Sequence, residues 1–155
     1  MTLTIVSGGQ TGVDRAALDV AIELGIPTGG WVPKGRLAED GVIPARYVNL
    51  READSADPSV RTRLNVRDSD ATLILSQGKL TGGSRLTFVE ATRLGRPVLH
   101  VDLTGRTDAE AAATVQTWLA AARPNILNIA GPRASGDGKI GARATAVLRN
   151  ALGRF

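Results

Sequence analysis

Short strand-like runs alternate with helical stripes of apolar residues along this chain. After the run 2–6, apolar residues recur every three or four positions from Val13 to Leu24, and Gly25 and Pro27 end the stripe as a helix stop does. Further strands are predicted at 28–32, 71–75, 98–101 and 126–130, and further helices at 58–68, 84–94, 107–122 and 140–152. This alternation predicts an α/β protein with a three-layer, Rossmann-like open parallel sheet of about five strands and helices on both faces.

The chain also repeats one pattern. A strand, Ser7, a glycine pair, a helix and the sequence Leu-Gly-Ile-Pro at 24–27 are echoed by a strand, Ser76, a second glycine pair, a helix and Leu-Gly-Arg-Pro at 94–97. Two such halves are typical of a doubly wound sheet, in which ligands bind beyond the carboxyl ends of the strands where the halves meet. Three glycine-rich loops follow predicted strands, at 7–12, 77–83 and 131–138.

The segment from Pro33 to Asp57 fits neither period, and we interpret it as a loop with a short strand near 47–50. Long irregular segments in compact domains are usually functional or mobile. Ser84 is expected to cap the helix that ends at Leu94. On the helix predicted at 58–68, we expect Val60, Leu64 and Val66 to face inward and Arg61, Arg63 and Arg67 to face outward.

Length and composition narrow the class of protein. With 155 residues, the chain is long enough for one domain, which we assign to 1–155. Zero cysteines and one histidine exclude disulfides, thiolate or multi-histidine metal sites and a catalytic thiol, so no metal ligands are assigned. No apolar run approaches the roughly 20 residues of a membrane helix, and the chain starts directly with a strand pattern. We therefore expect a cytoplasmic protein with no membrane partner.

The charge points to small anions rather than to nucleic acid. The net charge is +4, from 19 basic and 15 acidic residues, and no run of Lys or Arg is longer than two residues. Two Trp, two Phe and one Tyr are too few for stacking bases along a single strand. Phosphates could be matched by a few cations in loops.

The first loop has the spacing of a dinucleotide-binding fingerprint. Ser7, Gly9 and Gly12 stand at the G-x-G-x-x-G positions, with serine in the first place, between a strand and a helix. Lys34 follows the second strand, where an NAD-binding protein would carry an acidic residue, and no Gly-Lys-Ser/Thr follows, which excludes a P-loop. A tight turn without a ligand is the alternative for this loop.

The other two loops offer similar chemistry. Gly82 and Gly83 open a helix whose free amides could hold an anion, and Arg133 lies in the loop after the last strand. Glu90 shares a helical face with Leu86 and Leu94, so it is either paired structurally or placed at a site mouth. Asp14 is interpreted as a charge that favours the helix start, and His100 as a satisfied core or interface residue.

Three segments resemble one family. The segment 7–19 (SGGQTGVDRAALD), the segment 80–84 with Thr87, and the segment 127–133 are similar to the "putative molybdenum carrier" proteins, over almost the whole chain. That family belongs to a Rossmann-like superfamily shared with the lysine-decarboxylase-like, cytokinin-activating phosphoribohydrolases. The resemblance implies a carrier for molybdenum cofactor (molybdopterin), whose own dithiolene holds the metal, in a homo-oligomer that serves molybdoenzymes.

The residues themselves fit a phosphorylated pterin or a nucleotide equally well. The candidate ligand-binding residues are Ser7, Gly8, Gly9, Gln10, Thr11, Gly12, Lys34, Gly82, Gly83, Ser84, Thr87 and Arg133.

Two alternatives to a carrier stay open. The phosphoribohydrolase signature P-G-G-x-G-T-x-x-E compares with 81–90, where threonine replaces proline and the threonine and glutamate are each shifted by one residue. A hydrolase of nucleoside monophosphates would use Glu90 and Arg85, although one residue rotates a helical side chain by about 100°. A nucleotide-sensing module would use 33–57 as its moving part. We expect a binding protein rather than an enzyme.

Overall fold

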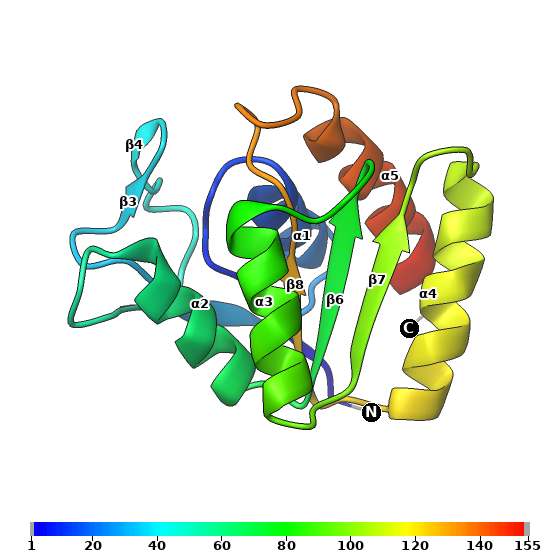
Figure 1. Cartoon of the computed structure of the whole chain (residues 1–155), viewed down its shortest axis with the longest axis horizontal. Coiled ribbons are helices and arrows are strands. Elements are labelled where there is room, and N and C mark those ends of the chain that lie inside the picture. Colours follow the sequence, from blue (N-terminus) through cyan, green and yellow to red (C-terminus); the bar gives the residue numbers. More distant parts are fainter. Residues whose placement is uncertain (1, 154–155) are drawn as a thin grey trace.

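The computed structural model describes residues 2–153 and contains a six-stranded, fully parallel sheet with helices on both faces (Figure 1). Its strands are β1 (Thr4–Val6), β2 (Thr28–Val32), β5 (Leu50–Glu52), β6 (Ala71–Ser76), β7 (Val98–Asp102) and β8 (Ile126–Ala130). The helices are α1 (Val13–Glu23), α2 (Pro58–Arg67), α3 (Gly82–Arg93), α4 (Asp108–Ala122) and α5 (Ile140–Leu152). A separate antiparallel hairpin joins β3 (Leu37–Ala38) and β4 (Gly41–Val42).

The predicted α/β class and the predicted helices and strands are confirmed, with three corrections. The sheet has six strands rather than about five, because β5 pairs with β2 at the sheet edge. The strand expected near 47–50 is this β5, which begins at Leu50, and the hairpin lies in the same irregular segment. Helix α3 starts at Gly82 with Thr81 at the N-cap position, so the prediction that Ser84 caps the helix is wrong and Ser84 lies in its first turn.

The strand order β5-β2-β1-β8-β6-β7 places the last strand of the chain in the middle of the sheet. The connections β1–β2 and β7–β8 run toward the β5 edge and carry α1 and α4 on one face, where α5 also packs. The connections β5–β6 and β6–β7 run toward β7 and carry α2 and α3 on the other face (Figure 1). Right-handed crossovers require this division. The chain therefore leaves β1 and β6, the two neighbours of β8, toward opposite faces, and a crevice results at their carboxyl ends.

The two faces of the sheet differ in polarity. The largest apolar cluster joins the sheet to α1, α4 and α5, and includes Ile5, Val115, Leu127 and Leu148, all fully buried. A smaller cluster of Leu18, Val32, Ile43 and Tyr47 anchors the segment that carries the hairpin. On the face of α2 and α3, several buried residues are polar: Thr62, Asn65, Thr72, Thr87 and Asn128. The polar face is the one that opens into a cavity.

Across the described residues, no helix combines the length and the apolar character needed to cross a bilayer.

Candidate ligand-binding site

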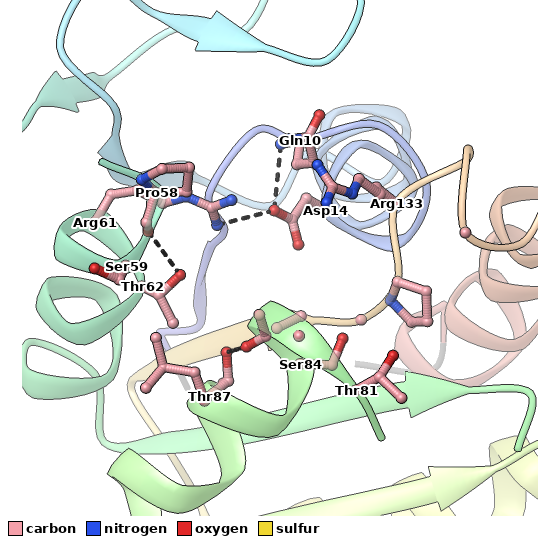
Figure 2. Close-up of a pocket in the computed structure, with 17 residues that line it drawn as sticks. Gln10, Asp14, Pro58, Ser59, Arg61, Thr62, Thr81, Ser84, Thr87 and Arg133 are labelled. Carbon is pink, nitrogen blue, oxygen red and sulfur yellow. Dashed lines mark hydrogen bonds and ion pairs between the residues drawn. The ribbon is translucent and has the colours of Figure 1, made fainter. Parts of the chain in front are cut away.

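A cavity of about 420 Å³ lies at the carboxyl ends of β8 and its neighbours, on the side of α2 and α3 (Figure 2). Its walls come from the loop after β1 and the start of α1, the first turns of α2 and α3, and the loop after β8. This volume is within the ordinary range for small-molecule sites, about 300–1,000 Å³. The position matches the strand-end location predicted from the sequence.

The serine and glycines of the first loop shape the site rather than line it. Ser7 is fully buried, and its Oγ donates to the Asp14 carbonyl at 3.0 Å and accepts from the Gly9 amide at 3.3 Å. Gly12 has φ of +81°, and a Cβ there would lie 2.3 Å from the Pro132 carbonyl oxygen. Glycine at this position therefore lets the first loop pack directly on the loop after β8.

The hairpin tip also holds the first loop. The Glu39 carboxylate accepts hydrogen bonds from the Thr11 hydroxyl and, at 3.1 Å, from the Ser135 amide. Gln10 Oε1 accepts from the Glu39 amide at 2.9 Å, and the Arg15 guanidinium pairs with Asp40 at 2.7 Å. Thr11 is thus occupied by the protein itself, whereas Gln10 also lines the cavity.

Asp14, which the sequence suggests only as a favourable charge at a helix start, lines the cavity. Its side chain is 4% exposed, lines the cavity, and accepts at Oδ2 from the Gln10 amide at 3.2 Å and from Arg61 Nη1 at 3.4 Å. Burial raises the pKa of the Asp14 carboxyl to about 6, against the opposing effect of the Arg61 and Arg15 cations. A carboxyl that changes protonation near neutral pH inside a cavity is typical of functional sites.

Arg61 points toward Asp14, so the prediction that it faces outward is wrong. The arginine packs over Gly8, where a Cβ would lie 1.9 Å from Nη1. Its Nε is buried and has no hydrogen-bond partner within residues 2–153. The available signal was the low number of apolar residues on this helix, which left polar residues such as Thr62 and Asn65 to face the sheet.

The first turn of α3 and Arg133 form an electropositive part of the cavity wall. Thr81 makes no side-chain cap, and the first intrahelical hydrogen bond starts from the Arg85 amide, so the amides of Gly82, Gly83 and Ser84 have no helical acceptor. These three residues, Thr87 and Arg133 all line the cavity. Free amides at a helix start and a guanidinium together suit a phosphate.

Other candidates lie elsewhere. Lys34 is exposed and outside the cavity lining, and its amide bonds to the Ser55 carbonyl at 2.9 Å. Gly9 faces Ile43 and Val32 instead of the cavity.

The residues of the hydrolase alternative are not assembled at the cavity. Glu90 is paired with Arg93 at 2.6 Å, and this partner lowers the pKa of the Glu90 carboxyl, which disfavours a role as a general acid. Neither Glu90 nor Arg85 lines the cavity. His100 has Ser76 Oγ at 2.6 Å from its Nε2, in agreement with a satisfied histidine in the sheet. Within residues 2–153, no group of three or more His, Asp or Glu side chains converges as a metal site.

Comparison with known proteins places the chain in a family. A family model described as the Circularly permutated YpsA SLOG family matches residues 5–152. The chain belongs to this family. In this member, counting strands from β6 gives the order 2-1-3-4-5-6, a doubly wound arrangement of flavodoxin type, so the strand order agrees with a permuted chain.

A solved structure is also similar to this chain in both sequence and fold. It is a "putative molybdenum carrier protein" from Syntrophus aciditrophicus SB, 49% identical, with a TM-score of 0.94 over 97% of this chain and 95% of that chain. The resemblance found in the loop motifs is therefore confirmed. No curated protein matches the chain.

Proposed function

We propose that this protein binds a phosphorylated small molecule in the cavity at the strand ends and carries it, with molybdenum cofactor as the leading ligand. One observation carries the proposal: the uncapped first turn of α3 and Arg133 line the same cavity. The name of the solved relative, a molybdenum carrier, supports the identity of the ligand.

The phosphate would lie between the α3 amides and Arg133. Three amides with no helical acceptor, at the positive end of the helix dipole, favour a doubly negative group. Arg133 would add a charge-assisted hydrogen bond, which is about twice as strong as a neutral one. The cavity volume of about 420 Å³ leaves room for a ring system beyond the phosphate.

The residues present fit molybdenum cofactor because such a ligand needs amides and cations for its phosphate. When bound, the cofactor supplies an oxo-metal centre held by its own dithiolene. The chain's own part is to bind and orient the phosphate through Arg133 and the α3 amides, and to keep the first loop in place through the hairpin contacts to Thr11 and Arg15.

Native mass spectrometry of the freshly purified protein tests the proposal. We expect a co-purifying mass equal to a phosphorylated pterin or a nucleotide, and loss of most of it in Arg133→Gln. Arg63→Gln is the matched control, because it removes the same charge from an exposed position that does not line the cavity. Equal occupancy in the wild type and in Arg133→Gln would contradict the proposed phosphate position.

The same spectra report the oligomeric state, for which a homo-oligomer stays a prediction. Transfer to molybdoenzymes and a cytoplasmic location also stay predictions.

A further inference from the structure

One part of the cavity wall can accept hydrogen bonds but has few protons to donate. Asp14, Thr62 and Thr87 form this part, and Figure 2 shows them around the open space. The Thr62 hydroxyl donates to the Pro58 carbonyl at 3.0 Å, and the Thr87 hydroxyl donates to the Gly83 carbonyl at 2.9 Å. Because each hydroxyl has a single proton, both threonines offer a ligand only lone pairs.

Asp14 adds the strongest acceptor. Its hydrogen bonds from the Gln10 amide and from Arg61 both end on Oδ2, at 3.2 Å and 3.4 Å. The Gly8 amide also stabilises the carboxylate, but a carboxylate has about four acceptor positions, so this cavity-lining side chain keeps acceptor capacity. A buried carboxylate with few partners is stabilised strongly by any ligand that brings N–H donors to it.

Apart from Arg61, which contacts Asp14, the donors and acceptors described above lie in different parts of one cavity. The α3 amides and Arg133 provide donors for an anion, whereas Asp14 and the two threonines need donors from the ligand.

We propose that the ligand carries, besides its phosphate, a ring edge with an exocyclic amine and an adjoining ring N–H that pairs with Asp14. This is the 2-amino-4-oxopyrimidine edge that pterins and guanine share. Arg61, in contact with Asp14, supplies a cationic donor beside these acceptors and suits the oxo group of the same edge. The inference rests on the proposed function and specifies the end of the ligand opposite its phosphate.

Ligand pairs that differ at the 2-amino position test the inference on the wild-type protein. Calorimetry would compare GMP with IMP, which lacks the amine, and pterin with lumazine, in which an oxo group replaces it. We expect the amino-bearing member of each pair to bind about 10- to 100-fold more tightly, since the pairing involves a charged acceptor. Competition by inorganic pyrophosphate against GMP measures the phosphate end separately.

The variant Asp14→Asn should reduce the preference within each pair to less than about threefold, whereas pyrophosphate should still compete with GMP, because the α3 amides and Arg133 are retained. Asp54→Asn, at an exposed position outside the cavity lining, should keep the full preference. If Asp14→Asn does not fold, the wild-type pairs still decide.

Equal affinities within both pairs, with pyrophosphate still competing, would overturn the inference and leave the proposed function in place. Failure of both pyrophosphate and GMP to bind would overturn the two together.

Discussion

At the residue scale, the Asp14–Arg61 pair combines burial with a loose ion pair. The two groups are 3.4 Å apart, and their side chains are 4% and 14% exposed. The free-energy cost of removing the Asp14 carboxylate from water exceeds the attraction to Arg61 at 3.4 Å. Burial therefore stabilises the protonated form of Asp14 relative to the ionised form. The pair is therefore poorly explained as a stabilising device, which supports the proposed role of Asp14 in ligand binding.

This balance predicts an unusual pH dependence of stability. The pKa of Asp14 is about 6 in the folded protein, against 3.8 for an ordinary aspartate, so the folded state keeps this proton to a higher pH than the unfolded state does. The protonated Asp14 side chain contributes about 3 kcal/mol to the free energy of unfolding below pH 3.8. This contribution is lost as pH rises from 3.8 through about 6. In urea unfolding between pH 4 and 7, the free energy of unfolding of the wild type should therefore fall relative to that of Asp14→Asn as pH rises. Parallel curves would refute the shifted pKa.

At the element scale, glycines at helix starts serve two different purposes. Gly12 allows two loops to touch, because a Cβ there would meet the Pro132 carbonyl oxygen at 2.3 Å. Gly83 has no neighbour within 4 Å of a Cβ, and it lines the cavity in the first turn of α3. Gly12 thus permits the contact between two loops, whereas Gly83 leaves the cavity free of a side chain at that point.

The two glycines should respond differently to the same substitution. Gly83→Val should retain the wild-type melting temperature to within a few degrees, because valine is a better helix residue than glycine, but ligand uptake should fall because the side chain enters the cavity. Gly12→Val should lower the free energy of unfolding by roughly 2–4 kcal/mol, through backbone strain and the clash with Pro132. Thermal denaturation and native mass spectrometry on both variants check this. Normal ligand uptake by Gly83→Val would remove α3 from the site.

At the scale of the whole molecule, the last strand occupies the centre of the sheet. β8 pairs with β1 on one side and with β6 on the other, so neither half of the chain completes the sheet without it. The cavity needs the same assembly, because its wall combines the loops after β1 and β8 with the starts of α2 and α3.

A circular permutant tests how far the fold depends on chain order. A chain that begins at Ala56, with Gly153 joined to Thr2 by a linker of about ten Gly and Ser residues, should fold cooperatively and bind the same ligand, since every strand pair is kept. A control truncated after Pro124 lacks β8 and α5 and should show no cooperative unfolding. Circular dichroism melts compare the two. An unfolded permutant would mean that chain order itself is needed for folding.

Local signals explain why most elements could be predicted. The stripe from Val13 to Leu24, with Gly25 and Pro27 after it, reports the burial of one helical face and its end. Thr107 caps α4 through a reciprocal bond with Glu110, which is a short-range preference. β5 could not be defined as well, because three residues at a sheet edge, two of them exposed and charged, carry no apolar pattern.

By itself, the sequence determined the α/β class, the three glycine-rich loops and the family, because each depends on residues close together in the chain. Only the tertiary structure decided which loop residues line the cavity. Asp14 and Arg61 are 47 positions apart, and they meet because two crossovers leave the sheet on opposite faces and because Gly8 leaves space for the guanidinium. Lys34 and Gly9 were excluded from the cavity by the same packing. The contact between such distant residues depends on how the sheet and the helices pack together. A short sequence motif carries no information about that packing.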